Sequence, residues 1–595
     1  MSDAAADDIL QYYKQELAYL RKQGAAFAQR YPKVAASLAL HGDESLDPHT
    51  ERLIESVAFL AARVHRDLDQ SFPQIASALL ENVCPSAMQP VPSMSVVQLG
   101  LDARQGKVTA GYPVPRHTEL VAQTHDGATC RFRTAWDATL WPLRVAATTL
   151  PDAQSVCLSI ETVGDADLAE LAVDRLRLHL HGDWMETMPV YELLVGSVKD
   201  IHVRRGDGTT LALGRGAWRE VGYERDDTVL SPPGHAYLPY VLLQEYFAFP
   251  RKFLFFDLVL PPGALGAGRG VDIVLCVGRS THHVRASTQK IFQLGCVPIV
   301  NLFRRSSEPI VLDRRHYEYP LVADRKHDAT TEIHAIESVT AIDPMADRAV
   351  PIASFTTGAG AGTPHGVAAS LDTVFWSARR EHSLRQHVPG TEMFISFVDV
   401  GNVPRCPSEP VVYASLLCTN RRLAELVPKG ARLSVGSRSR NIHARCLYEP
   451  TAPHDPPLGS AALWRLVSLL TLNYQSLTTD GDGDGVARLR DMLGLFATDR
   501  SHDHEQIQGI RAMTTRAATA RVGSEAWRGF CRGTDIVLAF DEGAFVGGSP
   551  LLLAAVLARF FAMYTSINSF VRVSARRGDE TWNHWDAMSG RQRLL

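Results

Sequence analysis

The sequence of 595 residues lacks the features that define several common classes of protein. Its 61 lysines and arginines stand against 65 aspartates and glutamates, so no overall basic excess would hold it on nucleic acid, although this leaves a local basic patch open. No uninterrupted apolar run reaches the length of a membrane span. The best candidate, residues 550–567, contains Arg559 and is predicted to be a buried helix. The acidic start, MSDAAADDILQYY, does not resemble a secretory signal.

Cysteine spacing excludes the usual metal and redox motifs. None of the nine cysteines forms CxxC or another metal-type pattern, and several lie in apolar segments such as IVLCVG around Cys276. We therefore expect free, buried and reduced thiols. Together with the missing signal and the missing membrane span, this predicts a soluble, cytoplasmic protein with no direct membrane insertion.

Calcium-loop chemistry is only partly represented. Segment Asp480–Gly485 reads DGDGDG and fits the start of a calcium-binding loop. The twelfth position of that loop is Asp491 rather than glutamate, and Arg488 and Arg490 place positive charge inside it. A solvated turn, with Asp484 capping the helix that follows, is the favoured interpretation.

Other catalytic motifs are incomplete. Ser501–Glu505 (SHDHE) offers imidazole and carboxylate groups, but we predict a polar loop that would not hold them in place. Glu381, His382 and His387 have the wrong order and spacing for a zinc protease. Residues 358–366 (GAGAGTPHG) resemble a phosphate loop without its lysine, and G-x-S-x-G is absent. We predict no catalytic residue, no cofactor and no metal site.

One segment is unusually rich in aromatic residues. Tyr246–Phe256 contains six aromatics in eleven residues, in a chain that is only 8% aromatic. Pro250 divides the segment into a predicted helical turn and a predicted strand, Phe253–Leu260, that is apolar on both faces. Such a strand is buried on both faces. We expect it to form the core of a rigid domain, with aromatics that pack rather than stack on a ligand.

The N-terminal region is predicted to be helical, with two apolar seams at alternating three- and four-residue spacing. The second helix starts at Asp47–Pro48, a capping residue followed by proline. A third helix is predicted from about Ser71. The seams either shield one another or dock on helices of a partner, and the pattern leaves both open. They comprise Leu10, Tyr13, Leu17, Leu20 and Phe27 in the first helix, and Ile54, Val57, Ala61, Val64 and Leu68 in the second.

The fold class predicted from these patterns is α+β with several domains, since the length implies about three or four. A helical segment is followed by two β-rich domains and a mixed α/β region, with a proline-rich linker after the helices. In the mixed region we predict helices at 464–477, 488–496 and 551–567 and strands at 534–540 and 570–575. The predicted boundaries are 1–92, 93–290, 291–455 and 456–595.

Ten blocks in order carry a resemblance to a known family. They begin with YYKQELAYLRKQGAAFAQRYPKVAASL and DPHTERLIESVAFLAARVHRDLDQSFPQIASALLENVCP, followed by PVPSMSVVQL and CRFRTA. The middle blocks are LLQEYFAFPRKFLFFDL, CVPIVNLF and CTNRRLAELVPKG. The last are WRLVSLLTLNYQSL, RGTDIVLAFDE and LARFFAMYTSINSFVRV. In these blocks the chain resembles the TssF family (also called VasA or ImpG), baseplate wedge subunits of the bacterial type VI secretion system, a contractile injection system.

The resemblance implies a structural role without catalysis. Members form wedges with TssG, typically two TssF copies to one TssG, together with TssE and TssK. The wedges surround a VgrG hub and carry the tail tube and contractile sheath, in the cytoplasm and docked at the inner membrane complex. The N-terminal helices are expected in a bundle with TssG, and the C-terminal parts in contact with neighbouring copies or wedges. The alternatives are a carbohydrate-binding β-sandwich module and a metal-dependent cell-wall hydrolase.

Overall fold

The structure is a computed structural model that describes most of the chain. The predicted loop at 358–366, the start of the acidic loop at 480–483 and the end of the predicted helix at 464–477 lie outside the described residues. The residues not described are 1–2, 38–39, 42–43, 46, 72–76, 78, 82–83, 102–108, 231, 234–235, 282–289, 346–347, 356–372, 384, 387, 400, 402, 437–441, 471–483, 499, 522–529, 579 and 592–595.

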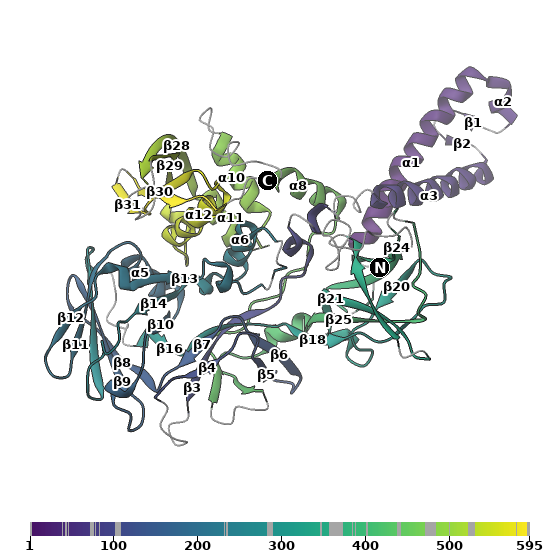
Figure 1. The fold of residues 1–595 in the computed structure, drawn as a ribbon. Coiled ribbons are helices and arrows are strands. Elements are labelled where there is room, and N and C mark those ends of the chain that lie inside the picture. Colours follow the sequence, from purple (N-terminus) through teal and green to yellow (C-terminus); the bar gives the residue numbers. More distant parts are fainter. Residues whose placement is uncertain are drawn as a thin grey trace.

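The N-terminal helices form a hairpin that projects from the rest of the molecule (Figure 1). Asp47 begins the second long helix as predicted, because its carboxylate accepts hydrogen bonds from the His49 amide and the Thr50 hydroxyl, each at 3.0 Å. These bonds also lower the pKa of the Asp47 carboxyl below its usual value. The elements are α1 (Asp3–Arg30), α2 (Pro32–Ser37), β1 (Leu40–His41), β2 (Glu44–Ser45) and α3 (Pro48–Ser71).

A short 3₁₀ helix, Pro85–Met88, connects the hairpin to the body and is buried. The Ser86 carbonyl accepts a hydrogen bond from Gln244 at 3.1 Å, and the Pro90 carbonyl bonds to His334 Nδ1 at 3.0 Å. The predicted proline-rich linker is therefore attached to two parts of the body. The third predicted helix lies mostly outside the described residues, although residues 79–81 are helical.

Six strands from residues 94–446 form a closed barrel, with strand order β17-β3-β27-β26-β5-β6. Its strands come from both predicted β-rich blocks, so these two stretches of sequence share one barrel. The Ser95 hydroxyl, for example, donates to the Tyr448 carbonyl at 2.8 Å. The strands are β3 (Met94–Leu101), β5 (Glu119–Gln123), β6 (Thr129–Thr134), β17 (Cys296–Val300), β26 (Arg432–Val435) and β27 (Ile442–Cys446), and β4 (Tyr112–Val114) pairs with β7 (Ala138–Leu140) beside them.

Two further sheets pack beside the barrel, in the blue and teal part of Figure 1. Their orders are β13-β14-β10-β16 and β12-β11-β15-β9-β8. The elements are β8 (Leu143–Asp152), β9 (Ser155–Thr162), β10 (Arg175–Leu180), α5 (Trp184–Leu194), β11 (Val198–Arg205), β12 (Thr210–Ala212), β13 (Trp218–Val221), α6 (Leu238–Ala248), β14 (Phe255–Val259), β15 (Gly270–Val277) and β16 (Phe292–Leu294). The sequence analysis did not predict α5.

The aromatic segment becomes α6, a 3₁₀ turn at Pro250–Phe253 and β14. The prediction of a strand buried on both faces is confirmed, although β14 starts two residues later than predicted. Phe255 packs into the core of the barrel, edge-on against Trp136 at a centroid distance of 5.0 Å. Phe256 and Leu258 point into a second, larger core. The strand thus joins two cores.

Another sheet, here called the outer sheet, has the order β18-β25-β21-β22-β23-β24-β20, with β19 also paired to β25. Figure 1 places it below the root of the hairpin. Its strands are β18 (Phe303–Ser306), β19 (Ile310–Val311), β20 (Glu318–Leu321), β21 (Glu332–Asp343), β22 (Arg348–Ser354), β23 (Phe375–His382), β24 (Thr391–Val398) and β25 (Val411–Thr419).

The last part of the chain forms a sheet, here called the C-terminal sheet, with order β28-β29-β30-β31 and β32 paired to β30. β29 and β30 are parallel and are connected through α12. The apolar run predicted as a buried helix at 550–567 forms α12, which ends three residues earlier than predicted, at Tyr564. α12 is buried along its length except at Arg559, which is half-buried and pairs with Glu220 at 2.9 Å. The elements are α8 (Ser460–Leu470), α10 (Asp484–Gly494), α11 (Ser501–Gln508), β28 (Ile510–Arg521), β29 (Phe530–Phe540), α12 (Pro550–Tyr564), β30 (Phe570–Arg577), β31 (Glu580–His584) and β32 (Met588–Ser589).

The predicted fold class is confirmed: N-terminal helices precede barrel and open β-sheets, and a mixed α/β region ends the chain. One local prediction is wrong. Ser501–Glu505 lies in α11 rather than in a polar loop. The run has few apolar residues, and its helix is stabilised by packing of Ile507 into the core and by the buried Asp503.

Candidate functional site: the N-terminal hairpin and a cleft beside the barrel

The two long N-terminal helices pack along each other. Arg21 of α1 donates to the carboxylate of Glu51 in α3, at 2.6 and 3.2 Å. Ala58 and Ala62 are fully buried in α3, and their small side chains let the helices approach closely. The sequence analysis did not include these two alanines among the seam residues. Their four-residue spacing on one helix face is the signal that identifies them.

The predicted seam residues lie around this contact rather than at its centre. Tyr13, Leu17 and Leu20 of α1 and Ile54 and Ala61 of α3 are half-buried. The remaining ones face solvent more than expected: Leu10 is 43% exposed, Phe27 38%, Val57 51% and Val64 59%. Leu68 lies in α3, but its side chain is outside the described residues. The hairpin therefore uses only part of each seam to hold itself together.

An apolar stripe runs along the outer face of α3. It consists of Leu53, Val57, Leu60 and Val64, which are between 51% and 66% exposed. Their spacing of four, three and four residues places all four within about one quarter of the helix circumference. A contiguous apolar surface of this kind on a projecting element is typical of a protein interface. We call these four residues the α3 stripe.

The residues considered for metal binding have structural roles. Asp503 is buried and accepts hydrogen bonds from the Thr498 amide at 3.0 Å and from the Thr498 hydroxyl. His502 Nε2 is bonded to the Gln506 side chain at 2.7 Å. Across the described residues, no group of three or more histidine, cysteine, aspartate or glutamate side chains is placed to hold a metal ion.

The cysteines are free thiols, as predicted, but Cys276, Cys406 and Cys531 are half-buried rather than buried. Burial raises the pKa of the Cys84 and Cys130 thiols to about 11 and that of Cys418 to about 12. A thiol with such a pKa stays protonated near neutral pH and is a poor nucleophile. Cys84, Cys130 and Cys418 act as small apolar core residues.

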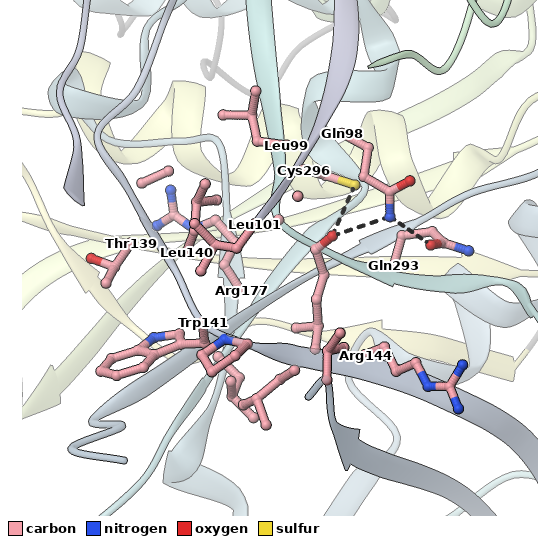
Figure 2. Close-up of a pocket in the computed structure, with 18 of the residues that line it drawn as sticks. Gln98, Leu99, Leu101, Thr139, Leu140, Trp141, Arg144, Arg177, Gln293 and Cys296 are labelled. Carbon is pink, nitrogen blue, oxygen red and sulfur yellow. Dashed lines mark hydrogen bonds between the residues drawn. The ribbon is translucent and has the colours of Figure 1, made fainter. Parts of the chain in front are cut away.

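A cleft of about 670 Å³ lies where the barrel meets the edges of β7, β8 and β16. Its polar side chains bond to one another: Gln98 donates to the Gln293 side chain at 2.9 Å and to the Leu294 carbonyl at 3.3 Å (Figure 2). Arg177 holds Asp257 through bonds of 2.8 and 2.9 Å. Gln98, Gln293 and Arg177 are thus bonded to their neighbours and are not directed at a common point in the cleft, whereas catalytic groups converge on the reacting atoms.

A buried ion pair, which we did not predict from the sequence, lies in the aromatic segment. The Glu245 carboxylate accepts hydrogen bonds from the backbone amides of Val229 and Leu230, at 2.6 and 2.8 Å, and from Lys252. The side chains of Glu245 and Lys252 are 0% and 1% exposed. The detectable signal was a pair of opposite charges seven residues apart in an aromatic-rich segment whose other charged residue is Arg251.

Searching the described residues finds no helix with the length and apolarity needed to span a bilayer.

Comparison with known proteins places the chain among secretion components. Residues 5–592 match the model of the family described as "Type VI secretion system, TssF". The chain is 33% identical, over an alignment of 612 residues, to the type VI secretion system component TssF1 of Pseudomonas aeruginosa, with 98% of each chain covered.

Two solved structures have the same fold. A chain in the cryo-electron microscopy structure of the type VI TssK–TssF–TssG baseplate subcomplex superposes with a TM-score of 0.71 at 21% identity, covering 91% of this chain and all of that one. A chain in a type VI baseplate complex gives a TM-score of 0.59 at 22% identity, covering 99% of this chain and all of that one.

Proposed function

This chain belongs to the TssF family of type VI secretion system components, and from that premise we propose that it is a structural wedge subunit of the baseplate that binds TssG through its N-terminal hairpin. The α3 stripe is the observation that carries the proposal, because four exposed apolar side chains on one face of a projecting helix fit an apolar helix of a partner. Of the predicted seam residues, Val57 and Val64 belong to this stripe, and Leu10 and Phe27 are further exposed apolar residues on α1.

The other partners follow from the family resemblance. In this proposal a wedge contains two copies of the chain and one TssG, together with TssE and TssK, and wedges surround the VgrG hub. The TssK–TssF–TssG subcomplex that shares the fold supports the first step of this assembly. The complete baseplate would lie in the cytoplasm against the inner membrane complex and carry the tube and the sheath.

The proposed mechanism is geometric. The barrel and the adjoining sheets hold the binding surfaces at set positions, and β14 couples two cores through Phe255 and Phe256. We also retain 1–92, 93–290, 291–455 and 456–595 as proposed functional divisions, with the barrel linking the second and third.

The alternative functions have weaker support. A carbohydrate-binding module would need exposed aromatic side chains grouped at one site, whereas Tyr246, Phe247, Phe249, Phe253 and Phe255 are each at most 3% exposed. A metal-dependent hydrolase would need a ligand group that the described residues do not provide.

Replacing Val57 by aspartate tests the interface. Val57 faces solvent in the isolated chain, so the Val57→Asp variant is expected to fold normally and to lose TssG on co-purification, because a charge in a dry apolar contact is strongly unfavourable. Ser56→Asp is the matched control: it adds the same charge at the adjacent exposed position, about 100° around the helix from Val57.

Two readouts decide the outcome. Circular dichroism of the isolated variants checks the fold, and light scattering of the co-expressed complex gives the stoichiometry, since each copy of the chain adds 65.4 kDa. Recovery of TssG by Val57→Asp at the yield of the parent would contradict the proposed interface. A parent complex with one copy per TssG would contradict the proposed stoichiometry alone.

A further inference from the structure

The C-terminal sheet ends in a long strand with an open edge. β28 spans 12 residues, and within the part of the chain that the structure describes its ladder partner is β29, on one side only. Every second residue of such an edge directs its amide and carbonyl away from the sheet, where they can pair with another strand. At the start of the edge the Ile510 carbonyl already accepts a hydrogen bond from Arg490 at 2.7 Å. We call the stretch beyond Ile510, where no described strand pairs with this side of β28, the open part of the edge.

The distal half of the β28–β29 hairpin extends beyond the core. Ile510 is the buried residue of β28, while residues 511–521 are exposed or half-buried. On β29 the buried residues are Ile536, Leu538 and Phe540, whereas Phe530 at the other end is 79% exposed. In Figure 1 the hairpin lies on the opposite side of the molecule from the α1–α3 hairpin. The two surfaces are therefore separate.

The edge lacks most of the features that prevent strand pairing. β28 is long and contains no proline, and its irregularity is confined to the register shift between Ile510 and Ala512. Beyond Arg516 the strand reads AATA, and these small side chains leave the backbone accessible. Natural edge strands of this length are usually blocked or covered. A strand of a partner protein could pair with β28 along this edge.

The charge of the edge specifies the partner. β28 carries Arg511, Arg516 and Arg521 and no acidic residue. Arg511 is neutralised by Asp541. Asp535 lies directly opposite Arg516 but is held by Arg572 through bonds of 2.8 and 2.5 Å, so this group of three keeps one positive charge. The positive charge thus lies in the open part of the edge.

We propose that the open edge of β28 receives an extended, acidic segment of another baseplate subunit, which adds a strand to the C-terminal sheet. Backbone hydrogen bonds supply most of the affinity, and carboxylates opposite Arg516 set the register. A second copy of β28 is a poor occupant, because it would bring two Arg516 groups together, each with a net positive charge, and neither strand carries an acidic residue. The proposal rests on the proposed function only in that the partner is a baseplate subunit.

Hydrogen–deuterium exchange read by mass spectrometry tests the pairing directly. The isolated chain is compared with the purified complex containing its TssG and TssK partners, whose mass is confirmed first. We expect exchange in residues 512–521 to slow at least about tenfold on assembly, because edge amides gain hydrogen bonds. Residues 536–539 of β29 lie between two paired strands and serve as the internal reference.

Two variants with equal charge change separate the proposal from a general electrostatic effect. Arg516→Glu is expected to keep the complex, which the hairpin holds, and to lose the slowing in 512–521. Arg576→Glu, at an exposed position of β30, is expected to keep both. Unchanged exchange of the parent chain on assembly, retained slowing in Arg516→Glu, or equal loss in Arg576→Glu would each overturn the proposal. If no complex forms at all, the proposed function fails first.

A photo-cross-linking residue in place of Ala518 identifies the occupant within the same purified complex. A cross-linked peptide of a partner subunit with more acidic than basic residues supports the proposal. A cross-link to β28 of a second copy, or to a basic segment, overturns it.

Discussion

The buried pair of Glu245 and Lys252 offers the sharpest test of how the central core is held together. We consider Lys252→Met, which keeps an unbranched side chain, shorter by one atom, and removes its charge. The Glu245 carboxylate would retain its bonds to the Val229 and Leu230 amides but lose its ionic partner in a site that is fully shielded from water. Breaking a buried pair by removing one partner typically costs about 3–5 kcal/mol.

That free energy translates into a large thermal shift. For a folding unit of 150–250 residues, each kcal/mol moves the melting temperature by about 2–4 °C, so we expect a decrease of roughly 6–20 °C. Differential scanning calorimetry is the suitable assay, because it resolves separate transitions in a chain with several sheets. Lys199→Met is the matched control: the same change at an exposed position of β11 is expected to stay within about 0.5 kcal/mol.

A double variant checks the reasoning. In Glu245→Gln/Lys252→Met neither buried charge remains, and the glutamine oxygen can still accept from the two amides. The double variant is therefore expected to lose less stability than Lys252→Met alone. Two results would contradict this account of the buried pair. One is a Lys252→Met transition shifted no more than that of the exposed control. The other is a double variant whose loss of stability equals the sum of the losses in Glu245→Gln and Lys252→Met within about 0.5 kcal/mol.

The remaining predictions concern other parts of the fold. Phe255→Ala removes a fully buried ring and is expected to lower stability by about 3–5 kcal/mol, measured as a lower melting temperature in the same calorimetric assay. Phe530→Ala, at a 79% exposed position, is the control and is expected to change the melting temperature little. Ala58→Leu would overpack the contact between α1 and α3 and is expected to cost about 1–3 kcal/mol of hairpin stability, and an unchanged melting curve followed by helical circular dichroism would contradict the close approach. Burial raises the pKa of the Glu81 carboxyl to about 7, against an ordinary value of 4.5. Because the pKa is higher in the folded state than in the unfolded state, the folded protein keeps its full stability below pH 4.5 and loses part of it as the pH rises through 7. Glutamine does not ionise, so Glu81→Gln is expected to raise the melting temperature at pH 8 but not at pH 4. An equal effect at both pH values would refute that assignment.

Much of the fold could be predicted from local patterns. The start of α3 at Asp47–Pro48, the buried β14 and the long apolar α12 follow from capping chemistry and from hydrophobic periodicity, which act over a few residues. α11 could not be predicted in this way, because SHDHEQIQ has no apolar face and depends on contacts made by Asp503 and Ile507. α5 was hidden by Pro189 inside the helix.

The candidate interface was only partly predictable. Three- and four-residue spacing identified Val57 and Val64 as seam residues, and both are exposed as a docking surface requires. The same spacing missed Leu53 and Leu60, which complete the α3 stripe. Periodicity shows that a helix has an apolar side, but several overlapping rows of residues on α3 have the same three- and four-residue spacing. Which stripe turns inward depends on the helix that packs against it, and here Ala58 and Ala62 admit the closest approach.

The sequence by itself determined the family of this chain, the free thiols, the two helical seams and the strand that joins the cores. Each of these depends on residue type and short-range spacing. Only the tertiary structure decided that the barrel combines strands from residues 94–134 with strands from 296–300 and 432–446. It also decided that β28 ends a sheet with an open edge. Strand pairing joins residues as distant as Val97 and Cys446, and no local pattern records which strand lies beside which.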